Sequence, residues 1–83
     1  MLLRTDVKAS AIATAEYRDT YAGWIDVQLL PYRTTRRGQP ITLYRWMDSR
    51  GCTHGWLGGH SASWAMCAAR FCTRFRYVYP VTE

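Results

Sequence analysis

The residues best suited to chemistry are the cysteines and histidines between positions 52 and 67. Cys52, His54, His60 and Cys67 form a C-x-H-x5-H-x6-C run, and zinc takes Cys and His ligands at short spacings. The run matches no common zinc finger, and Cys67 falls on the apolar stripe of an expected helix, where reduced cysteine is an ordinary core residue. A Cys–His nucleophile pair would need a pocket that a thin domain seldom has. We therefore expect no metal, no cofactor and no catalytic residues.

The acidic residues are scattered singly and offer no acid–base pair. They are Asp6, Glu16, Asp19, Asp26, Asp48 and Glu83. None stands at a helical or strand spacing that would pair it with another for proton transfer, so solvated surface charge is their expected role. The glycines between Gly55 and Gly59 lack the Lys-Ser/Thr that follows a phosphate-binding loop. These patterns predict a protein that binds and does not catalyse.

Arginine dominates the charged residues. The chain carries 11 Lys+Arg against 6 Asp+Glu, a formal net charge of +5, and every base except Lys8 is Arg. The guanidinium fork suits carboxylates, phosphates and aromatic faces, and Arg, Trp and Tyr dominate binding hot spots. A GC-rich genome would also enrich Arg without a functional cause, and that alternative stays open. The predicted partner-binding residues are Trp24, Arg33, Arg36, Arg37, Tyr44, Arg45, Trp46, Arg50, Arg70 and Arg74.

One helix is predicted near the C-terminus, from Ser61 to Phe75. Apolar residues recur there at i, i+3, i+4, i+7, i+8 and i+11, which indicates one buried stripe. The stripe consists of Trp64, Cys67, Ala68, Phe71, Cys72 and Phe75. Ser61 or Ser63 can cap its start, and arginines crowd its last turns, where cations suit the helix dipole.

The rest of the chain has the pattern of strands and turns. Alternation predicts a strand from Trp24 to Leu30, which Pro31 ends or marks as an edge. The polar segment Thr34–Gln39 predicts a hairpin loop, and Asp48–Gly51 a turn. Further strands are expected at Ile41–Met47, Thr53–Leu57 and Tyr77–Val81, and at Ala9–Tyr17, where a strand is favoured over a helix.

These elements predict a single α+β domain over residues 1–83. It would be an antiparallel sheet of three to five strands with the C-terminal amphipathic helix packed on one face. If Ile25, Val27 and Leu29 face the helix, then Trp24, Asp26 and Gln28 face outward. Tyr44 and Trp46 then either join that outer face as an aromatic platform or face the helix themselves. Both registrations are open.

The composition also bears on location. No apolar run approaches the roughly 18 residues of a membrane span, and Met1-Leu2-Leu3-Arg4 is too short for a signal peptide. An odd number of cysteines without a spaced framework argues against a secreted disulfide scaffold. The expected location is the cytoplasm of the host cell, without membrane association. Nothing in the sequence indicates an oligomeric state.

Part of the chain resembles known DNA-binding domains. The segment from Gly55 to Arg70, with Trp56-Leu57-Gly58 before an Ala-rich stretch, is similar in rhythm to the last strand and helix of the ethylene-response-factor type of domain. It is also similar to the arm-binding domains of phage integrases. The resemblance implies a three-stranded sheet that enters the major groove, with Arg33, Arg45 and Trp46 as contacts. The N-terminal strand and the C-terminal tail lie outside it.

The whole chain resembles, in style, the accessory proteins of phages and mobile elements, such as anti-CRISPR proteins and other host-takeover inhibitors. It shares with them a short α+β chain and a surplus of interface-type residues. The resemblance implies an inhibitor that binds a host protein or ribonucleoprotein complex and blocks its nucleic-acid engagement or partner docking. No motif defines such proteins, so no residue carries over. The alternative is a DNA- or RNA-binding module that uses the sheet face and the arginine clusters.

Overall fold

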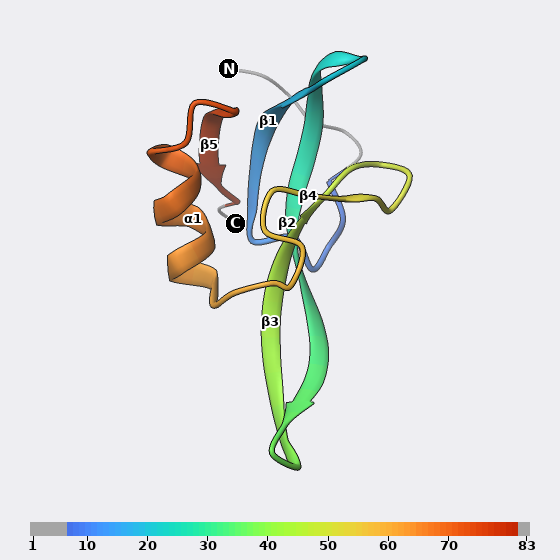
Figure 1. Cartoon of the computed structure of the whole chain (residues 1–83), viewed down its shortest axis with the longest axis vertical. Helices are drawn as coiled ribbons and strands as arrows, with labels where there is room; N and C mark the ends of the chain where they lie inside the picture. Colours follow the sequence, from blue (N-terminus) through green and yellow to red (C-terminus); the bar gives the residue numbers. More distant parts are fainter. Residues whose placement is uncertain (1–6, 82–83) are drawn as a thin grey trace.

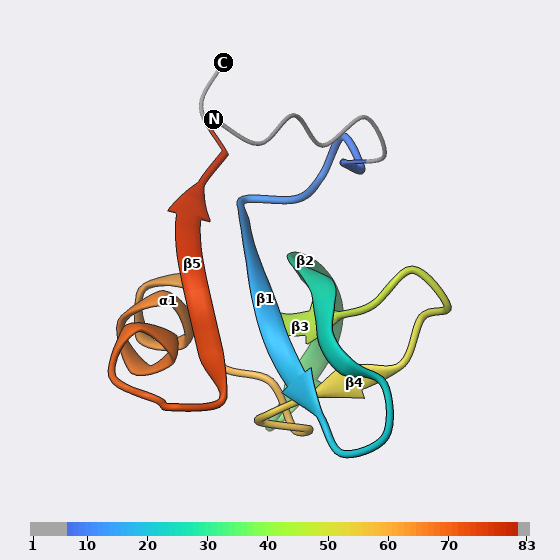
Figure 2. The same cartoon turned by 90° about the horizontal axis from the view of Figure 1, so that it is seen from above.

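The computed structural model describes residues 7–81, which form an antiparallel sheet of five strands and one helix (Figure 1). The elements are β1 (Ala13–Asp19), β2 (Gly23–Arg36), β3 (Gln39–Met47), β4 (Thr53–His54), α1 (Ala62–Arg70) and β5 (Phe75–Pro80). Their order across the sheet is β4-β3-β2-β1-β5. Helix α1 lies to one side of the sheet, next to β5 (Figure 2). The expected α+β class is confirmed.

The core lies between one face of the sheet and α1. Alternation along β2 turns Val27 and Leu29 toward it, both 0% exposed, and Ile25 packs against them partly buried. The predicted inward face of this strand is thus confirmed. The other buried core residues are Ala13, Ala15, Trp46, Ala65, Ala69 and Phe75.

The registration of β3 decides where its aromatic residues lie. Trp46 pairs with Leu29 across the sheet, and directly paired residues share a face. Trp46 therefore enters the core and is 1% exposed, while Tyr44 packs partly buried against the same cluster. The second of the two open registrations is the observed one. An outward platform containing Tyr44 and Trp46 was the wrong alternative.

Helix α1 is shorter than predicted and buries a different face. Ser61 caps it, its Oγ accepting a hydrogen bond from the backbone N–H of Trp64 at 3.4 Å. The helix ends at Arg70, and Phe75 belongs to β5, because the chain must turn back to pair with β1. The buried helix residues are Ala65 and Ala69. Small side chains let the helix approach the sheet, where Trp46 Nε1 donates to the Ala65 carbonyl at 3.4 Å.

Strand β2 continues through Pro31, which does not end it. Opposite Pro31, Tyr44 directs its backbone N–H and carbonyl toward His60 on its other side, with N···O distances of 2.7 and 3.1 Å. Pro31 and Tyr44 therefore form a pair without hydrogen bonds between them. The missing proline N–H would have faced the side of β2 that β1 has already left, since the pairing with β1 reaches only Leu29. Pro31 thus marks a local edge, the second of the predicted alternatives.

The predicted hairpin loop is a two-residue turn between longer strands. Arg36 pairs with Gln39, and Arg37 and Gly38 alone connect them with φ values of 54° and 78°. Positive φ at both central residues is the type I′ pattern, whose twist matches that of the strands. The turn at Asp48–Gly51 is confirmed by the Gly51 N–H, which donates to the Asp48 carbonyl at 3.1 Å.

The remaining strands differ from prediction in their ends. The N-terminal strand is confirmed as a strand, but it runs from Ala13 to Asp19. The predicted strand at Thr53–Leu57 stops at His54, because Gly55 turns with φ of 74°. The Phe75 ring lies 3.2 Å from where a Cβ would project at Gly55, so the ring occupies the space of a side chain. The predicted C-terminal edge strand is confirmed at Phe75–Pro80.

Candidate functional site

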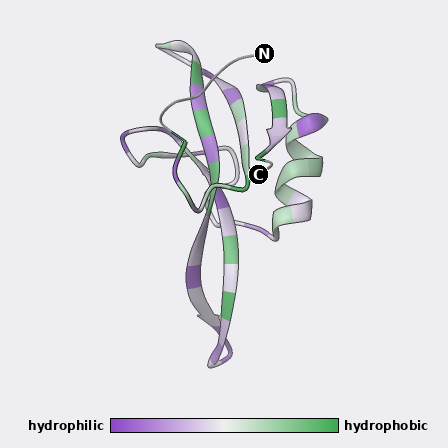
Figure 3. Ribbon diagram, turned by 180° about the vertical axis from the view of Figure 1, so that it is seen from behind, coloured by the Kyte–Doolittle hydropathy of each residue, from purple (hydrophilic) through white to green (hydrophobic). Residues whose placement is uncertain are grey.

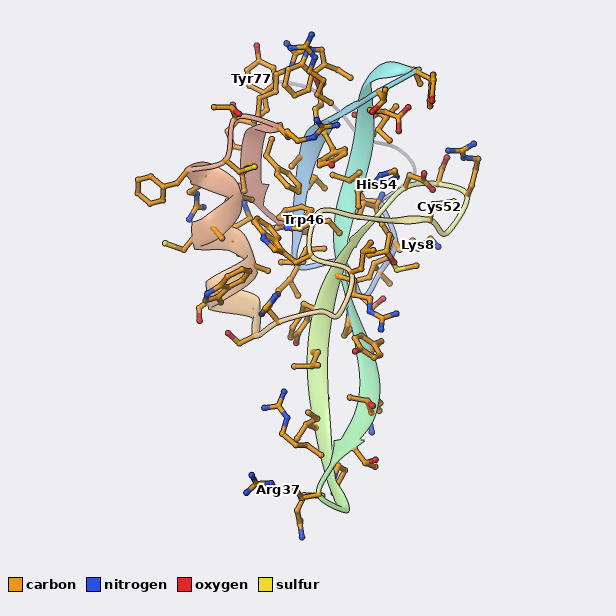
Figure 4. The ribbon with its side chains drawn as sticks, in the orientation of Figure 1. Lys8, Arg37, Trp46, Cys52, His54 and Tyr77 are labelled. Atoms are coloured by element: carbon orange, nitrogen blue, oxygen red, sulfur yellow. The ribbon has the colours of Figure 1, made fainter. Side chains whose placement is uncertain are left out.

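The three arginines of the β2–β3 hairpin are fully available to a partner. Arg33, Arg36 and Arg37 are exposed, and none of their guanidinium groups forms a hydrogen bond or ion pair with another residue among positions 7–81. Figure 4 places Arg37 at the tip of the hairpin, away from the other labelled residues. The structure thus brings these predicted residues together on one projecting element.

Most other predicted arginines have partners within the protein. The guanidinium carbon of Arg45 lies 3.6 Å from the centre of the Tyr32 ring. Arg50 forms an ion pair with Asp48 at 3.3 Å. Arg74 donates to the Arg18 carbonyl at 2.7 Å. Arg70 is exposed in the last turn of α1, which lies away from the tip of the β2–β3 hairpin (Figure 1). The predicted cations therefore do not form one continuous surface.

The aromatic residues predicted to bind a partner also lie in different parts of the structure. Trp46 is buried, so its assignment as a partner contact, including as a DNA contact, is corrected. Tyr44 is half-buried against the core. Trp24 lies on the outer face, where the Arg76 guanidinium covers its ring at 3.9 Å. Of this set, only Trp24 faces outward, and its ring is already covered.

Sequence reasoning missed an exposed apolar row on α1. Trp64, Cys67 and Phe71, here called the α1 row, lie on the side of the helix away from Ala65 and Ala69. Trp64 is 43% exposed and Phe71 is 85% exposed. Figure 3 shows α1 coloured toward hydrophobic along most of its length. The apolar periodicity detected these residues as part of a buried stripe. Of that stripe, Phe75 lies in the core and Cys72 packs against it, but the three residues of the α1 row were wrongly assigned to the core.

Trp64 is held in place by neighbouring rings. Its indole stacks on His60 with 3.8 Å between centroids, and it meets Trp56 edge-on at 5.0 Å. Trp56 in turn stacks on the buried Phe75 at 5.5 Å. The exposed end of this series is therefore fixed to the core, which reduces the rotamer entropy that Trp64 would lose on binding.

The cysteines and histidines between positions 52 and 67 do not form one cluster, because each has different surroundings. His54 Nε2 lies 2.8 Å from Asp48 Oδ2, His60 stacks on Trp64, and Cys52 and Cys67 are exposed. Within the described part of the chain, no three His, Cys, Asp or Glu side chains are grouped so that they could hold a metal ion.

Asp48 is not the solvated surface charge that was predicted. Its side chain is 5% exposed and accepts from the backbone N–H groups of Arg50 and Cys52 at 2.8 and 3.0 Å. Burial acts to raise the pKa of this carboxyl, but the hydrogen bonds from His54 and the two N–H groups outweigh it, so the pKa lies well below its ordinary value. Asp48 thus organises the turn between β3 and β4.

The other described carboxylates lie nearer the surface. Glu16 pairs with Arg76 at 2.9 Å. Asp19 accepts from the backbone of Ala22 and Tyr21, which lowers its pKa. Asp26 is exposed. The predictions for Asp6 and Glu83 lie outside the described residues.

A β-bulge places two tyrosines on the outer face of β5. Thr14 pairs with Tyr79 and Glu16 with Arg76, so Tyr77 and Val78 together stand opposite Ala15. The shift turns Val78 toward the core and leaves Tyr77 and Tyr79 51% and 57% exposed. Tyr77 has a φ of 55°, a strained value for a bulky residue.

Replacing Tyr77 with asparagine should therefore stabilise the protein. Asparagine tolerates left-handed backbone, and the strain of a non-glycine residue there costs about 1 kcal/mol or more. We expect Y77N to raise the free energy of unfolding by about 1 kcal/mol in urea denaturation. The matched control is Y79N, since Tyr79 is similarly exposed without a positive φ. An equal change in both variants would contradict the strain argument.

Comparisons with models of protein families, with curated proteins and with solved structures found no match for this chain. No helix within residues 7–81 is long and apolar enough to cross a membrane. Function is therefore inferred from the surfaces of the protein. The two that stand out are the α1 row and the arginines of the β2–β3 hairpin.

Proposed function

We propose that this chain is a non-enzymatic binding protein of the phage-inhibitor type, which docks on a host protein or ribonucleoprotein complex through the α1 row. The observation that carries the proposal is the exposure of Trp64 and Phe71 on the same side of α1, about two helical turns apart. Residues at i and i+7 of a helix lie on one face. Apolar groups gathered on one surface mark a site that a partner covers.

The energy available from this row is sufficient for a specific contact. Burying one large aromatic or aliphatic side chain contributes about 1.5–3 kcal/mol. Phe71 is almost fully exposed, so nearly all of its burial energy remains for a partner. Trp64 adds a ring that is already oriented by His60 and Trp56. An exposed, oriented tryptophan of this kind is typical of the hot spots of protein interfaces.

The host complex would be inhibited because the bound protein covers a surface that the complex needs for its activity. An interface of standard size covers roughly 800 Å² of each partner, so the surface around the α1 row would contribute with it. That area is enough to block a nucleic-acid channel or a docking site on a larger complex. The proposed partner is therefore a complex whose activity depends on such a surface.

Phe71→Ser tests the proposal with little risk to the fold. Because Phe71 is 85% exposed, we expect the free energy of unfolding to change by less than about 0.5 kcal/mol. Capture of the host partner from nuclease-treated lysate should fall at least about tenfold, since removing a hot-spot ring costs about 2 kcal/mol. The matched control is Tyr21→Ser, which removes a ring that is 96% exposed on the β1–β2 turn.

Two results would contradict the proposal. One is capture that F71S and Y21S reduce equally, because the α1 row would then have no special role. The other is a wild-type dimer in light scattering that F71S converts to monomer, because a second copy of the chain would then cover the row. A one-to-one complex with a host protein that F71S alone dissociates would support it.

A further inference from the structure

The β2–β3 hairpin projects beyond the rest of the sheet as a free two-stranded arm (Figure 1). Strand β1 leaves β2 at Leu29, and the last backbone contact on the β3 side is the bridge between Tyr44 and His60. At the base of the projecting part, the Tyr32 hydroxyl still donates to the Gly58 carbonyl at 2.8 Å. From the pair Tyr32–Leu43 to the pair Arg36–Gln39, the two strands pair only with each other. We call residues 32–43 the arm.

The arm is uniformly basic. It contains Arg33, Arg36 and Arg37, and the sequence has no Asp or Glu between Asp26 and Asp48. These three guanidinium groups have no partner among residues 7–81. The arginines at the other end of the sheet differ, since Arg50 and Arg76 are paired with carboxylates. A cluster of unneutralised cations on a projecting element favours an anionic partner that surrounds it.

The dimensions of the arm suit a groove of duplex DNA. Four residue steps separate Tyr32 from Arg36, which at about 3.4 Å per residue gives about 14 Å of free strand. The major groove of B-DNA is about 8.5 Å deep and about 12 Å wide, and it admits a two-stranded β-ribbon. The arm can therefore reach the floor of the groove before the body of the protein meets the backbone.

The arginines are placed to contact both walls of such a groove. Arg33 and Arg36 are an odd number of residues apart on one strand, so their side chains leave opposite faces of the ribbon. Arg33 also lies about 10 Å behind Arg36 along the strand. With the tip of the arm inside the groove, Arg33 would therefore stand at the rim beside the phosphates. The long, flexible side chains of Arg36 and Arg37 would extend from the tip back to phosphates on the walls.

We infer that the arm binds double-stranded DNA by entering the major groove, with Arg33, Arg36 and Arg37 neutralising phosphates on its two walls. The tip argues against a lipid surface, because Arg36-Arg37-Gly38-Gln39-Pro40 contains no aromatic or large aliphatic side chain to insert. Duplex RNA fits less well, since its major groove is deep and narrow. This inference is independent of the proposed contact through the α1 row.

The test measures binding of the full chain to a 20-base-pair DNA duplex of arbitrary sequence across a range of salt concentrations. Three phosphate contacts predict a slope of log K against log salt of about −2.7, so raising salt from 50 to 200 mM should weaken binding about 40-fold. The variant R36T/R37N removes two contacts. It should lose affinity about 60-fold at 0.1 M salt and reduce the slope by about 1.8.

The substitutions are chosen to keep the arm folded. Threonine favours strands, and asparagine before Gly38 gives the Asn-Gly pair that type I′ turns prefer. The matched control R18A/R70A removes the same charge from exposed residues outside the arm. It should change affinity less than about threefold, because charges farther than about 10 Å are screened at 0.1 M salt. R36K/R37K should retain most of the affinity, since Lys also contacts phosphate.

The inference is overturned by any of three results. The first is no shift of the duplex at micromolar protein and low salt. The second is equal loss in R36T/R37N and R18A/R70A, which would assign binding to net charge alone. The third is arm-dependent binding to anionic phosphatidylserine vesicles or to duplex RNA that equals or exceeds binding to DNA. Loss confined to the arm variant, with DNA preferred, supports it.

Discussion

Trp46→Ala is expected to lower the free energy of unfolding by about 3–5 kcal/mol, the usual cost of truncating a buried aromatic residue. Trp46 is the largest of the fully buried side chains in the described structure. It contacts Phe75 with ring centroids 5.3 Å apart, and it donates to the Ala65 carbonyl. Its removal opens a cavity at the contact between β3, β5 and α1. A domain of this size has a total stability of about 4–12 kcal/mol, so the substitution would remove a large part of it.

Urea denaturation followed by far-ultraviolet circular dichroism measures this loss. Trp64→Ala is the matched control, because Trp64 is 43% exposed and lies on the outer side of α1. Its expected cost is about 1 kcal/mol, the average for a single substitution. If both variants lost the same stability, the registration of β3 that turns Trp46 into the core would be wrong. The outward aromatic platform would then be restored as an interpretation.

Asp48→Asn is expected to destabilise the protein by about 2–3 kcal/mol at neutral pH, since hydrogen bonds to a charged group contribute about 1.5–3 kcal/mol each. The carboxylate accepts from the backbone of Arg50 and Cys52 and lies 2.8 Å from His54 Nε2. An amide keeps only one acceptor oxygen for these groups. The loss should loosen the Asp48–Gly51 turn and the short pairing of β4 with β3.

The same substitution should change how stability depends on pH. The pKa of Asp48 is lowered in the folded protein, so its ionised form is stabilised relative to the unfolded chain. That contribution is fully present above the unfolded pKa of about 3.9 and is lost progressively as the pH falls below it. The wild type should therefore lose more stability than D48N between about pH 5 and pH 2.

Urea denaturation of both proteins across that pH range isolates the contribution of Asp48, because Glu16, Asp19 and Asp26 are common to both. The two curves should converge at the acidic end, where Asp48 approaches protonation. Parallel curves, with a constant difference at every pH, would contradict the assignment. Asp48 would then act through its shape and not through its charge.

Several local features were predictable because their causes are local. Ser61 caps α1 by a hydrogen bond to a residue three positions on, and Asp48–Gly51 closes a turn within four residues. The hairpin at Gly38 is specified by the glycine itself, which accepts a positive φ. The inward face of β2 followed from strict alternation around Val27. Each of these signals is complete within a few residues of sequence.

The features that failed prediction depend on neighbours distant in the chain. Apolar periodicity identified a stripe at Trp64 and Phe71, but the space beneath α1 was already filled by Trp46 and Phe75. Where the helix meets these rings only small side chains fit, so Ala65 and Ala69 face inward while Trp64 and Phe71 face solvent. The buried role of Asp48 likewise depends on His54, which β4 brings beside it.

The sequence by itself determined the fold class, the strand-rich order and the position of the hairpin, because backbone propensity and alternation act over short segments. Only the tertiary structure decided which surfaces remain for partners. The arginines near Gly38 became a free arm because β1 leaves β2 at Leu29, and the apolar row of α1 became exposed because the core was already full. Both outcomes depend on competition for space among elements far apart in the chain, which no local pattern records.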